Sequence, residues 1–292
     1  MPALLRRRLG RTGLDVSVLG FGTAPLGDLF IRIPDDVAIA TVERAFALGI
    51  NLLDSSPLYG RGLAEHRCGT ALRRVNRPDI VLCTKVGRWM DPFHAPDDVA
   101  GFVGGRPHRA VFDYSYDGTM RSVEQSLLRL GTDRLDLLLI HDVDVWTHGR
   151  DAIEQRFRQA MEGAYVALDR LRGEGVVKGI GVMLGGVFNS GILATGAVSS
   201  AKYNYCDAPA EILDRVSRIE RVCAAHNTPL PTAALHFALG HPAVASLVLG
   251  GVTPQEVERN VAALSSQVPP ALWRDLKAAH LLDEAAPVPE HD

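Results

Sequence analysis

Short apolar runs alternate with stretches of helical periodicity along most of this chain. The runs predict parallel strands that end near Gly22, Asp54, Lys85, Ile140 and Val182. Alternation of this kind is typical of a parallel sheet covered by helices. When such strands close into a barrel, functional side chains gather at their carboxyl ends while the strand bodies pack. The pattern predicts an α/β protein with a (β/α)8 barrel, formed as one domain over residues 1–292.

The remaining pattern predicts the other elements. A β-hairpin is expected over residues 5–18 and the first barrel strand over 16–22. A helix is expected on the face formed by Val37, Thr41, Ala45 and Leu48, with Asp35 or Asp36 as its N-cap. A long loop is expected over residues 87–117. Further helices are expected at residues 64–74, around 123–130, and at 152–172, 209–226, 231–240 and from 254, with strands at 177–182 and 246–249.

One junction breaks the barrel pattern. Residues 183–187 have the composition of a strand, yet they directly follow the strand that ends at Val182. Parallel neighbours need a crossover of about a dozen residues or more, and none is present. The chain shows seven strand signals where a closed barrel needs eight. The sequence therefore predicts that about one β/α unit, in the region of the sixth strand, is missing near residues 182–184.

Composition and charge exclude several classes of protein. The chain is 47% hydrophobic and has a net charge of −3, with no basic patch of the kind that binds nucleic acid. No segment has the ~18 consecutive apolar residues of a membrane span. The single basic run, residues 6–8, is expected to be a solvated strand face. The four cysteines (Cys68, Cys83, Cys206 and Cys223) lack metal or redox spacing, which predicts reduced thiols in a cytoplasmic protein. The sequence does not indicate an oligomeric state.

Four side chains at the predicted strand ends could carry chemistry. Asp54, Lys85 and His141 each follow an apolar run, and Tyr59 lies on the loop after Asp54. A phenol ionises near pH ~10, and a nearby ammonium lowers that pKa. The sequence thus predicts that Lys85 makes Tyr59 unusually acidic, with Asp54 anchoring Lys85. Such a group suits proton transfer coupled to hydride transfer.

Other site types have weaker support. The G-x-G-x-x-G fingerprint fails because Pro25 stands at its last position, and no phosphate-binding P-loop is present. Residues 141–144 (His-Asp-Val-Asp) lack further ligands, so no metal site is predicted.

The carboxyl half offers an anion site. Residues 250–256 have the pattern of a glycine turn into a helix, with Thr253 as N-cap, Pro254 at the first position and Glu256 closing a capping box. Helix N-termini bind phosphate groups through free N–H groups. Residues 185–191 form the candidate companion loop.

Several motifs together resemble the aldo-keto reductase superfamily. They are residues 9–14 (Leu-Gly-Arg-Thr-Gly-Leu), 54–60 (Asp-Ser-Ser-Pro-Leu-Tyr-Gly), 84–87 (Thr-Lys-Val-Gly) and 141–142 (His-Asp). Within that superfamily, residues 112–117, 141–149 and 188–196 are similar to its aldose 1-dehydrogenases. The resemblance covers nearly the whole chain. It implies a barrel that holds a nicotinamide cofactor without a Rossmann domain, with Tyr59 as acid/base supported by Asp54, Lys85 and His141.

The resemblance also implies a set of cofactor contacts: Gly22, Thr23, Asp54, Phe188, Asn189, Ser190, Gly191, Leu193, Gly250, Gly251, Val252, Thr253, Glu258 and Asn260. Members that prefer NADP carry cations where this chain has Val252 and Glu258. A carboxylate repels a 2′-phosphate but accepts from a ribose hydroxyl, so NAD is favoured over NADP. Family members also carry a helix, a strand and a helix where this chain passes from Val182 to Leu184.

The function that the resemblance implies is oxidation of a free aldose at C1 to the lactone. Trp89 and Trp146 could stack on a sugar ring, while Asp142 and His148 could bind its hydroxyls. Two alternatives stay open. One is an oxidoreductase acting on pyridoxal or a small aldehyde or alcohol, and the other is a catalytically impaired barrel that binds a cofactor or a partner.

Overall fold

The computed structural model describes residues 4–97, 101–181, 187–204, 206–241 and 243–289. Its contacts divide the chain into two units, of which the first is Met1–Leu184 with Gly250–Val257 and the second is Gly185–Leu249 with Glu258–Asp292. The expectation of a single domain stays a prediction.

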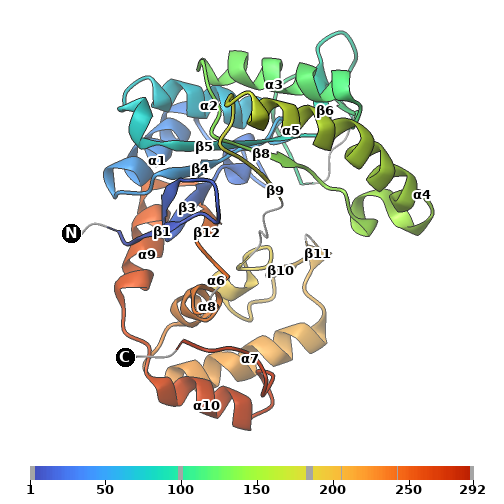
Figure 1. The fold of residues 1–292 in the computed structure, drawn as a ribbon. Coiled ribbons are helices and arrows are strands. Elements are labelled where there is room, and N and C mark those ends of the chain that lie inside the picture. The colour runs from blue at the N-terminus through green and yellow to red at the C-terminus, as the bar shows by residue number, and fades with distance from the viewer. Residues whose placement is uncertain (1–3, 98–100, 182–186, 205, 242, 290–292) are drawn as a thin grey trace. The chain divides into compact units, whose positions relative to one another are not determined.

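The first unit is built on a parallel β-sheet with helices packed against it (Figure 1). Its consecutive strands are β3 (Leu19–Gly22), β4 (Leu52–Asp54), β5 (Val81–Val86), β8 (Leu137–Ile140) and β9 (Gly179–Gly181). Each strand runs parallel to the next, so their carboxyl ends lie at one edge of the sheet. Phe21, Leu53, Leu82 and Leu138 fill the interior and are almost completely buried. The predicted strand order and strand ends are therefore confirmed to within one or two residues.

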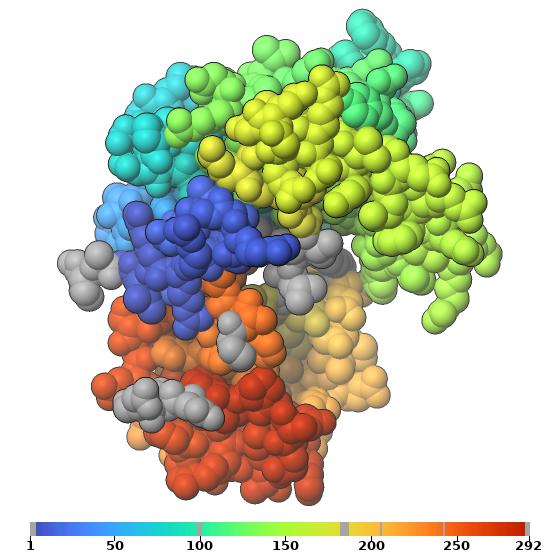
Figure 2. Space-filling model, in the orientation of Figure 1, coloured from blue at the N-terminus to red at the C-terminus, as the bar shows by residue number. Residues whose placement is uncertain are grey.

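The predicted amino-terminal hairpin is present and lies against the start of this sheet. β1 (Arg6–Arg8) pairs antiparallel with β2 (Asp15–Ser17). The Ser17 N–H donates to Asn51 Oδ1 at 2.7 Å, just before β4. A Cβ on Gly179 would lie 2.6 Å from the Thr12 methyl group, so the hairpin turn packs against β9. In the space-filling view the hairpin is the dark blue region on the near face of this unit (Figure 2).

Helices α1 (Asp35–Ala47), α2 (Leu63–Leu72) and α3 (Tyr116–Leu130) lie where the periodicity predicts them. Short 3-10 helices, η1 (Ala24–Gly27) and η2 (Arg77–Asp79), precede α1 and β5. The predicted N-cap of α1 is wrong, because Pro34 holds that position. Asp35 lies inside the first turn, where its carboxylate accepts from Arg67 Nε at 2.8 Å.

The segment predicted as one long loop contains a second hairpin. β6 (Arg88–Asp91) and β7 (Arg109–Phe112) pair antiparallel, with Trp89 opposite Val111. The loop prediction is corrected to the connection between these two strands. The strands are only four residues each and are far apart in sequence, so no short-range turn signal marks their pairing.

The helix predicted at 152–172 begins earlier than expected. It consists of α4 (Val145–Gln159), a π-helical turn η3 (Ala160–Ala164) and α5 (Tyr165–Gly173). Asp144 caps α4 by accepting from the Thr147 N–H at 2.7 Å. Gly149 has φ 74° and interrupts the helical periodicity, which hides the first turn from sequence-based prediction.

The second unit is mainly helical. Its elements are α6 (Ile192–Thr195), β10 (Lys202–Tyr203), β11 (Cys206–Asp207), α7 (Ala210–Ala225), α8 (Leu230–Leu239) and α10 (Pro270–Ala278). Trp273 and Leu272 of α10 pack in its core with Val216 and Cys223 of α7. β12 (Leu247–Gly250) and α9 (Pro254–Ser265) contain residues of both units. Helix α6, helix α10 and the β10–β11 pair were not predicted.

The predicted break in the barrel falls on residues that the structure does not describe. Residues 182–186 lie outside the described ranges, so the strand predicted at 183–187 is visible only at Val187, which is in a turn. Within the described part of the sheet, β9 is the last strand on its side. Among the described residues, no helix has the length and apolar character needed to cross a membrane.

Candidate active site

A buried ion pair lies at the carboxyl edge of the sheet. Asp54 ends β4, and Lys85 lies one residue before the end of the neighbouring strand β5. Lys85 Nζ donates to both carboxylate oxygens of Asp54, at 2.9 and 2.7 Å, and to the Ser55 carbonyl at 2.8 Å. The side chains of Asp54 and Lys85 are 7% and 9% exposed. Because all three Lys85 donors have acceptors, the ammonium is held in one position.

Tyr59 and His141 lie beside this pair, as the sequence predicts. Lys85 Nζ is 4.8 Å from the centre of the Tyr59 ring. The Tyr59 and His141 rings meet edge to face, with centroids 5.9 Å apart. All four predicted catalytic side chains therefore belong to one group at the strand ends of the first unit.

The predicted acidity of Tyr59 is wrong for the protein as folded. Burial raises the pKa of Tyr59 to about 12, although the charge of Lys85 acts in the opposite direction. The Asp54 carboxylate also raises this pKa, and so opposes the influence of the ammonium that it anchors. Tyr59 is thus a protonated hydrogen-bond donor at neutral pH.

The other two titratable groups have defined charge states. Burial lowers the pKa of Lys85, but Asp54 and Tyr59 more than offset it, so this pKa lies above its usual range. Burial, together with the charges of Lys85 and Arg88, holds the pKa of His141 well below its usual range. The site therefore contains a charged lysine, a neutral imidazole and a neutral phenol beside the Asp54 carboxylate.

Asp142 is held by neighbours of its own. Arg88 donates from Nη1 to Asp142 Oδ2 at 2.6 Å, and the Arg88 guanidinium lies 3.9 Å from the centre of the Phe112 ring. Asp142 has φ 54°, in the left-handed region. The Tyr114 hydroxyl donates to the His141 carbonyl at 2.8 Å and lies 3.0 Å from His148 Nε2. These contacts fix the backbone that presents His141.

The four predicted sugar-binding residues do not all lie beside the candidate catalytic side chains. Trp89 packs against Arg121, whose guanidinium carbon lies 4.5 Å from the ring centre. Trp146 is 75% exposed on α4. Asp142 contacts His141, while His148 contacts Tyr114. Of these four, Asp142 alone touches one of the candidate catalytic side chains among the described residues.

A strap of residues 101–106 lies over Tyr59. Phe102 stacks on the Tyr59 ring, with centroids 6.3 Å apart and an interplanar angle of 23°. The strap is attached by backbone hydrogen bonds, since the Val103 N–H donates to the Asp28 carbonyl and the Arg106 N–H to the Gly60 carbonyl. Arg61 donates from Nη2 to the Gly104 carbonyl at 2.7 Å. Sequence reasoning missed this arrangement because the strap has no regular periodicity.

Part of the predicted cofactor surface belongs to the first unit. Thr23 Oγ1 donates to Ser55 Oγ at 2.8 Å, next to Asp54. A Cβ on Gly250 would lie 2.7 Å from the Pro25 side chain and 3.5 Å from the Gly22 carbonyl oxygen. The Gly250 backbone therefore packs directly against residues 22–25 at the end of β3.

Thr253 caps the α9 N-terminus as predicted, but the Glu256 carboxylate accepts from Val252, whereas a capping box would require the Thr253 N–H. The Glu256 N–H donates to Thr253 Oγ1 at 3.3 Å, and the Glu256 carboxylate accepts from the Val252 N–H at 2.9 Å. A negative charge therefore already lies at this helix N-terminus. The Glu256 carboxylate accepts a hydrogen bond from the Val252 N–H, which is one of the backbone groups that the sequence predicts would bind an anion.

The remaining predicted cofactor residues belong to the second unit. Phe188, Asn189, Ser190 and Gly191 form the turn before α6, which contains Leu193. Asn189, Ser190 and Gly191 all have positive φ, at 40°, 60° and 100°. Glu258 and Asn260 lie on α9.

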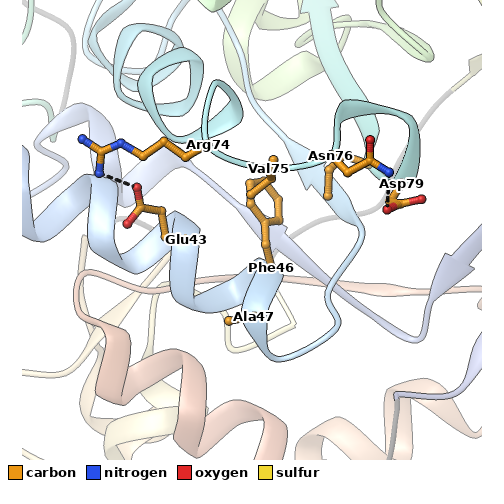
Figure 3. A pocket seen from close by; sticks show the side chains of 8 residues that line it. Glu43, Phe46, Ala47, Arg74, Val75, Asn76 and Asp79 are labelled. Carbon is orange, nitrogen blue, oxygen red and sulfur yellow. Dashed lines mark hydrogen bonds and ion pairs between the residues drawn. The ribbon is translucent and has the colours of Figure 1, made fainter.

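A pocket of about 480 Å³ has a lining that shares no residue with this group (Figure 3). It is lined by Glu43, Phe46 and Ala47 of α1 and by residues between Arg74 and Ile80. Its polar groups are paired, Arg74 with Glu43 at 2.7 Å and Asn76 with Asp79 at 2.8 Å. It contains none of the predicted catalytic residues.

Comparisons with known proteins agree with this geometry. The profile of the Aldo/keto reductase family matches residues 18–184 and 185–280. The chain is 34% identical to a pyridoxal 4-dehydrogenase from Microbacterium luteolum, over 97% of this chain and 99% of that protein. It is 32% identical to a D-threo-aldose 1-dehydrogenase from Pseudomonas sp., over 92% of this chain and 96% of that protein.

A solved structure supports the fold. An aldo-keto reductase from Bacillus halodurans, in its holo form, is similar with a TM-score of 0.71 at 24% identity, covering 97% of this chain and 98% of that one. The family match breaks between residues 184 and 185, and the alignment with the pyridoxal dehydrogenase has 342 positions for a chain of 292 residues. Both observations agree with the predicted loss of a β/α unit.

Proposed function

Because the chain belongs to the aldo-keto reductase family, with its (β/α) barrel fold and NAD(P)-dependent oxidoreductase chemistry, we propose that it oxidises a cyclic hemiacetal to a lactone. The proposed substrate is a free aldose, oxidised at C1 with NAD as hydride acceptor. The observation that carries the proposal is the group formed by Tyr59, Lys85, Asp54 and His141 at the strand ends.

Each of the four side chains has a proposed role. In the oxidation direction Tyr59 reacts as its phenolate, whose Oη takes the proton of the substrate hydroxyl as the adjacent carbon loses hydride. In the reverse direction the Tyr59 phenol donates that proton. The Lys85 ammonium stabilises this phenolate form. Asp54 keeps Lys85 charged and immobile through two hydrogen bonds. His141 donates a hydrogen bond to the substrate oxygen. When bound, the nicotinamide ring supplies the hydride acceptor.

One observation on the described residues of the first unit supports a site for a nicotinamide cofactor. A Cβ at position 250 would overlap Pro25, so the Gly250 backbone approaches the end of β3 closely. This close approach lies next to Thr23 and Asp54. Thr23, Asp54 and the backbone of residues 250–253 would hold the cofactor in this unit. Phe188–Leu193, Glu258 and Asn260 are the proposed contacts in the second unit.

A preference for NAD over NADP is part of the proposal. The turn before α9 carries Val252 rather than a cation, and the helix carries Glu256 and Glu258. The Glu256 carboxylate is already bonded to the Val252 N–H, so an additional phosphate would lie near an existing negative charge. Comparable kcat/KM values with NADP and NAD would contradict this preference.

Pyridoxal is the second candidate substrate. Both pyridoxal and an aldose close into cyclic hemiacetals in water, so both offer a hydroxyl-bearing carbon that yields a lactone on losing hydride. The stacked pair of Phe102 and Tyr59 favours a flat or ring-shaped substrate of either kind. The similarity to a pyridoxal 4-dehydrogenase is the specific reason to include it.

A substrate panel tests the proposal. L-fucose, D-arabinose, L-galactose and pyridoxal are each incubated with NAD, and NADH formation is followed by absorbance. The proposal predicts NADH formation with at least one sugar, and activity with pyridoxal alone would select the second candidate.

A binding control accompanies the panel. Titration with NAD, followed by tryptophan fluorescence, reports cofactor binding without turnover. Absence of both turnover and binding at millimolar NAD would instead support the alternative of an impaired barrel.

We also propose that the protein acts in the cytoplasm, on the basis of its unpaired cysteines.

A further inference from the structure

Both ring nitrogens of His141 have a polar neighbour. Nδ1 lies 3.1 Å from the Ser56 hydroxyl oxygen, and Nε2 lies 3.3 Å from Asp142 Oδ1. A neutral imidazole carries its proton on one nitrogen only, and the partner of each nitrogen determines which one. The two neighbours can therefore be used to assign the proton.

Ser56 requires an acceptor for its own proton. Its side chain is fully buried, and its oxygen accepts from the Leu58 N–H at 3.2 Å. Among the residues that the structure describes, His141 Nδ1 is the one acceptor within reach of this hydroxyl. A buried O–H without an acceptor is unfavourable, so Ser56 donates to Nδ1. Nδ1 must then be unprotonated.

Asp142 leads to the same assignment from the opposite side of the ring. Its carboxylate is paired with Arg88 at 2.6 Å, and an ionised carboxylate only accepts hydrogen bonds. Its contact with Nε2 is favourable when that nitrogen carries a proton and repulsive when it carries a lone pair. Two independent contacts therefore place the proton on Nε2.

We propose that Ser56 is a positioning residue that fixes the proton of His141 on Nε2, where it serves as donor to the substrate oxygen. The proposal rests on the proposed function for the role of the donated proton, but not for the tautomer itself. The fully protonated ring is disfavoured because burial, Lys85 and Arg88 all hold the pKa of His141 well below its usual range.

The arrangement has a consequence for substrate binding. Before substrate arrives, Nε2 lies 3.3 Å from Asp142 Oδ1 without forming a hydrogen bond to it, so its proton is available to the substrate oxygen. Asp142 keeps its bond to Arg88 through Oδ2 and is not left unpaired. Without Ser56, the ring could also adopt the Nδ1–H form, which offers a lone pair to the substrate oxygen and repels it.

The tautomer is measured directly by NMR. Two-bond 1H–15N correlation spectra of the 15N-labelled protein distinguish a protonated ring nitrogen from an unprotonated one, and a spectrum of His141→Gln identifies the signals of this histidine. The proposal predicts a protonated Nε2 and an unprotonated Nδ1 in the unliganded protein at neutral pH. A protonated Nδ1 in that protein would overturn it.

Variants at Ser56 test its role. In Ser56→Ala we expect a protonated Nδ1 form to appear and kcat to fall about tenfold, with KM for NAD unchanged. Ser56→Thr keeps the hydroxyl and should restore both the tautomer and most of kcat. Ser17→Ala removes another fully buried hydroxyl of the same unit and should leave the His141 signals unchanged. A His141 tautomer in Ser56→Ala that matches the one in the unmodified protein would overturn the proposal.

These outcomes separate the two hypotheses. If no substrate of the panel is turned over but the spectra show the predicted tautomer and its dependence on Ser56, the proposed function fails and the positioning role of Ser56 remains. If turnover requires Tyr59 but the tautomer does not respond to Ser56, the positioning role fails alone.

Discussion

Replacing Lys85 with methionine should destabilise the protein strongly. The substitution keeps a similar side-chain length but leaves the Asp54 carboxylate, 7% exposed, without its two hydrogen bonds at 2.7 and 2.9 Å. Removing one partner of a buried ion pair costs about 3–5 kcal/mol, because the remaining charge is uncompensated. The free energy of unfolding, measured by urea titration followed by circular dichroism, should fall by that amount.

Two controls isolate burial as the cause. Arg74 and Glu43 also form an ion pair at 2.7 Å, but their side chains are 64% and 33% exposed, so Arg74→Met should cost no more than about 1 kcal/mol. Asp54→Asn combined with Lys85→Met removes the stranded charge and should be more stable than Lys85→Met alone. A loss below about 1 kcal/mol for Lys85→Met, or a double variant less stable than the single one, would refute the reasoning.

Three further predictions concern the site and its strap. Because burial raises the pKa of Tyr59 to about 12, the phenolate fraction, and with it kcat/KM for oxidation, should rise about tenfold per pH unit from pH ~7 to ~10; a flat profile would contradict the assigned base. Phe102→Ala removes the ring stacked on Tyr59 and should raise KM for a cyclic substrate about tenfold, with NAD affinity unchanged by fluorescence titration. Gly104→Ala would place a Cβ 2.2 Å from the Asp28 carboxylate and should lower the free energy of unfolding by about 1–3 kcal/mol, whereas Gly173→Ala meets nothing within 4 Å and should not; equal effects would show that the strap is not close-packed.

The strand ends could be predicted from sequence because a buried parallel strand is a nearly continuous apolar run. Asp54 and Lys85 each follow such a run, and the parallel topology then forces their side chains to one edge of the sheet. No tertiary information was needed for that step. The hairpin at residues 6–17 was equally accessible, because its alternation and glycine turn are both local.

The features of the site that the sequence did not predict depend on contacts between residues far apart in the chain. The predicted acidity of Tyr59 was wrong because the sequence reveals only one of the influences on its pKa. The lowering effect of the Lys85 charge could be inferred, but burial of the phenol and the opposing charge of Asp54 could not. The strap over Tyr59 and the contact of Ser56 with His141 join residues 43 and 85 positions apart. Neither contact leaves a periodic pattern in the chain.

The most direct test of the central claim is the rate of NADH formation by Tyr59→Phe, measured at saturating NAD with the best substrate of the panel. The variant keeps the ring and loses only the hydroxyl that is proposed to accept the proton. We expect kcat to fall by about a hundred- to ten-thousand-fold while the affinity for NAD, measured by fluorescence, stays the same. A kcat within about tenfold of the unmodified protein would contradict it.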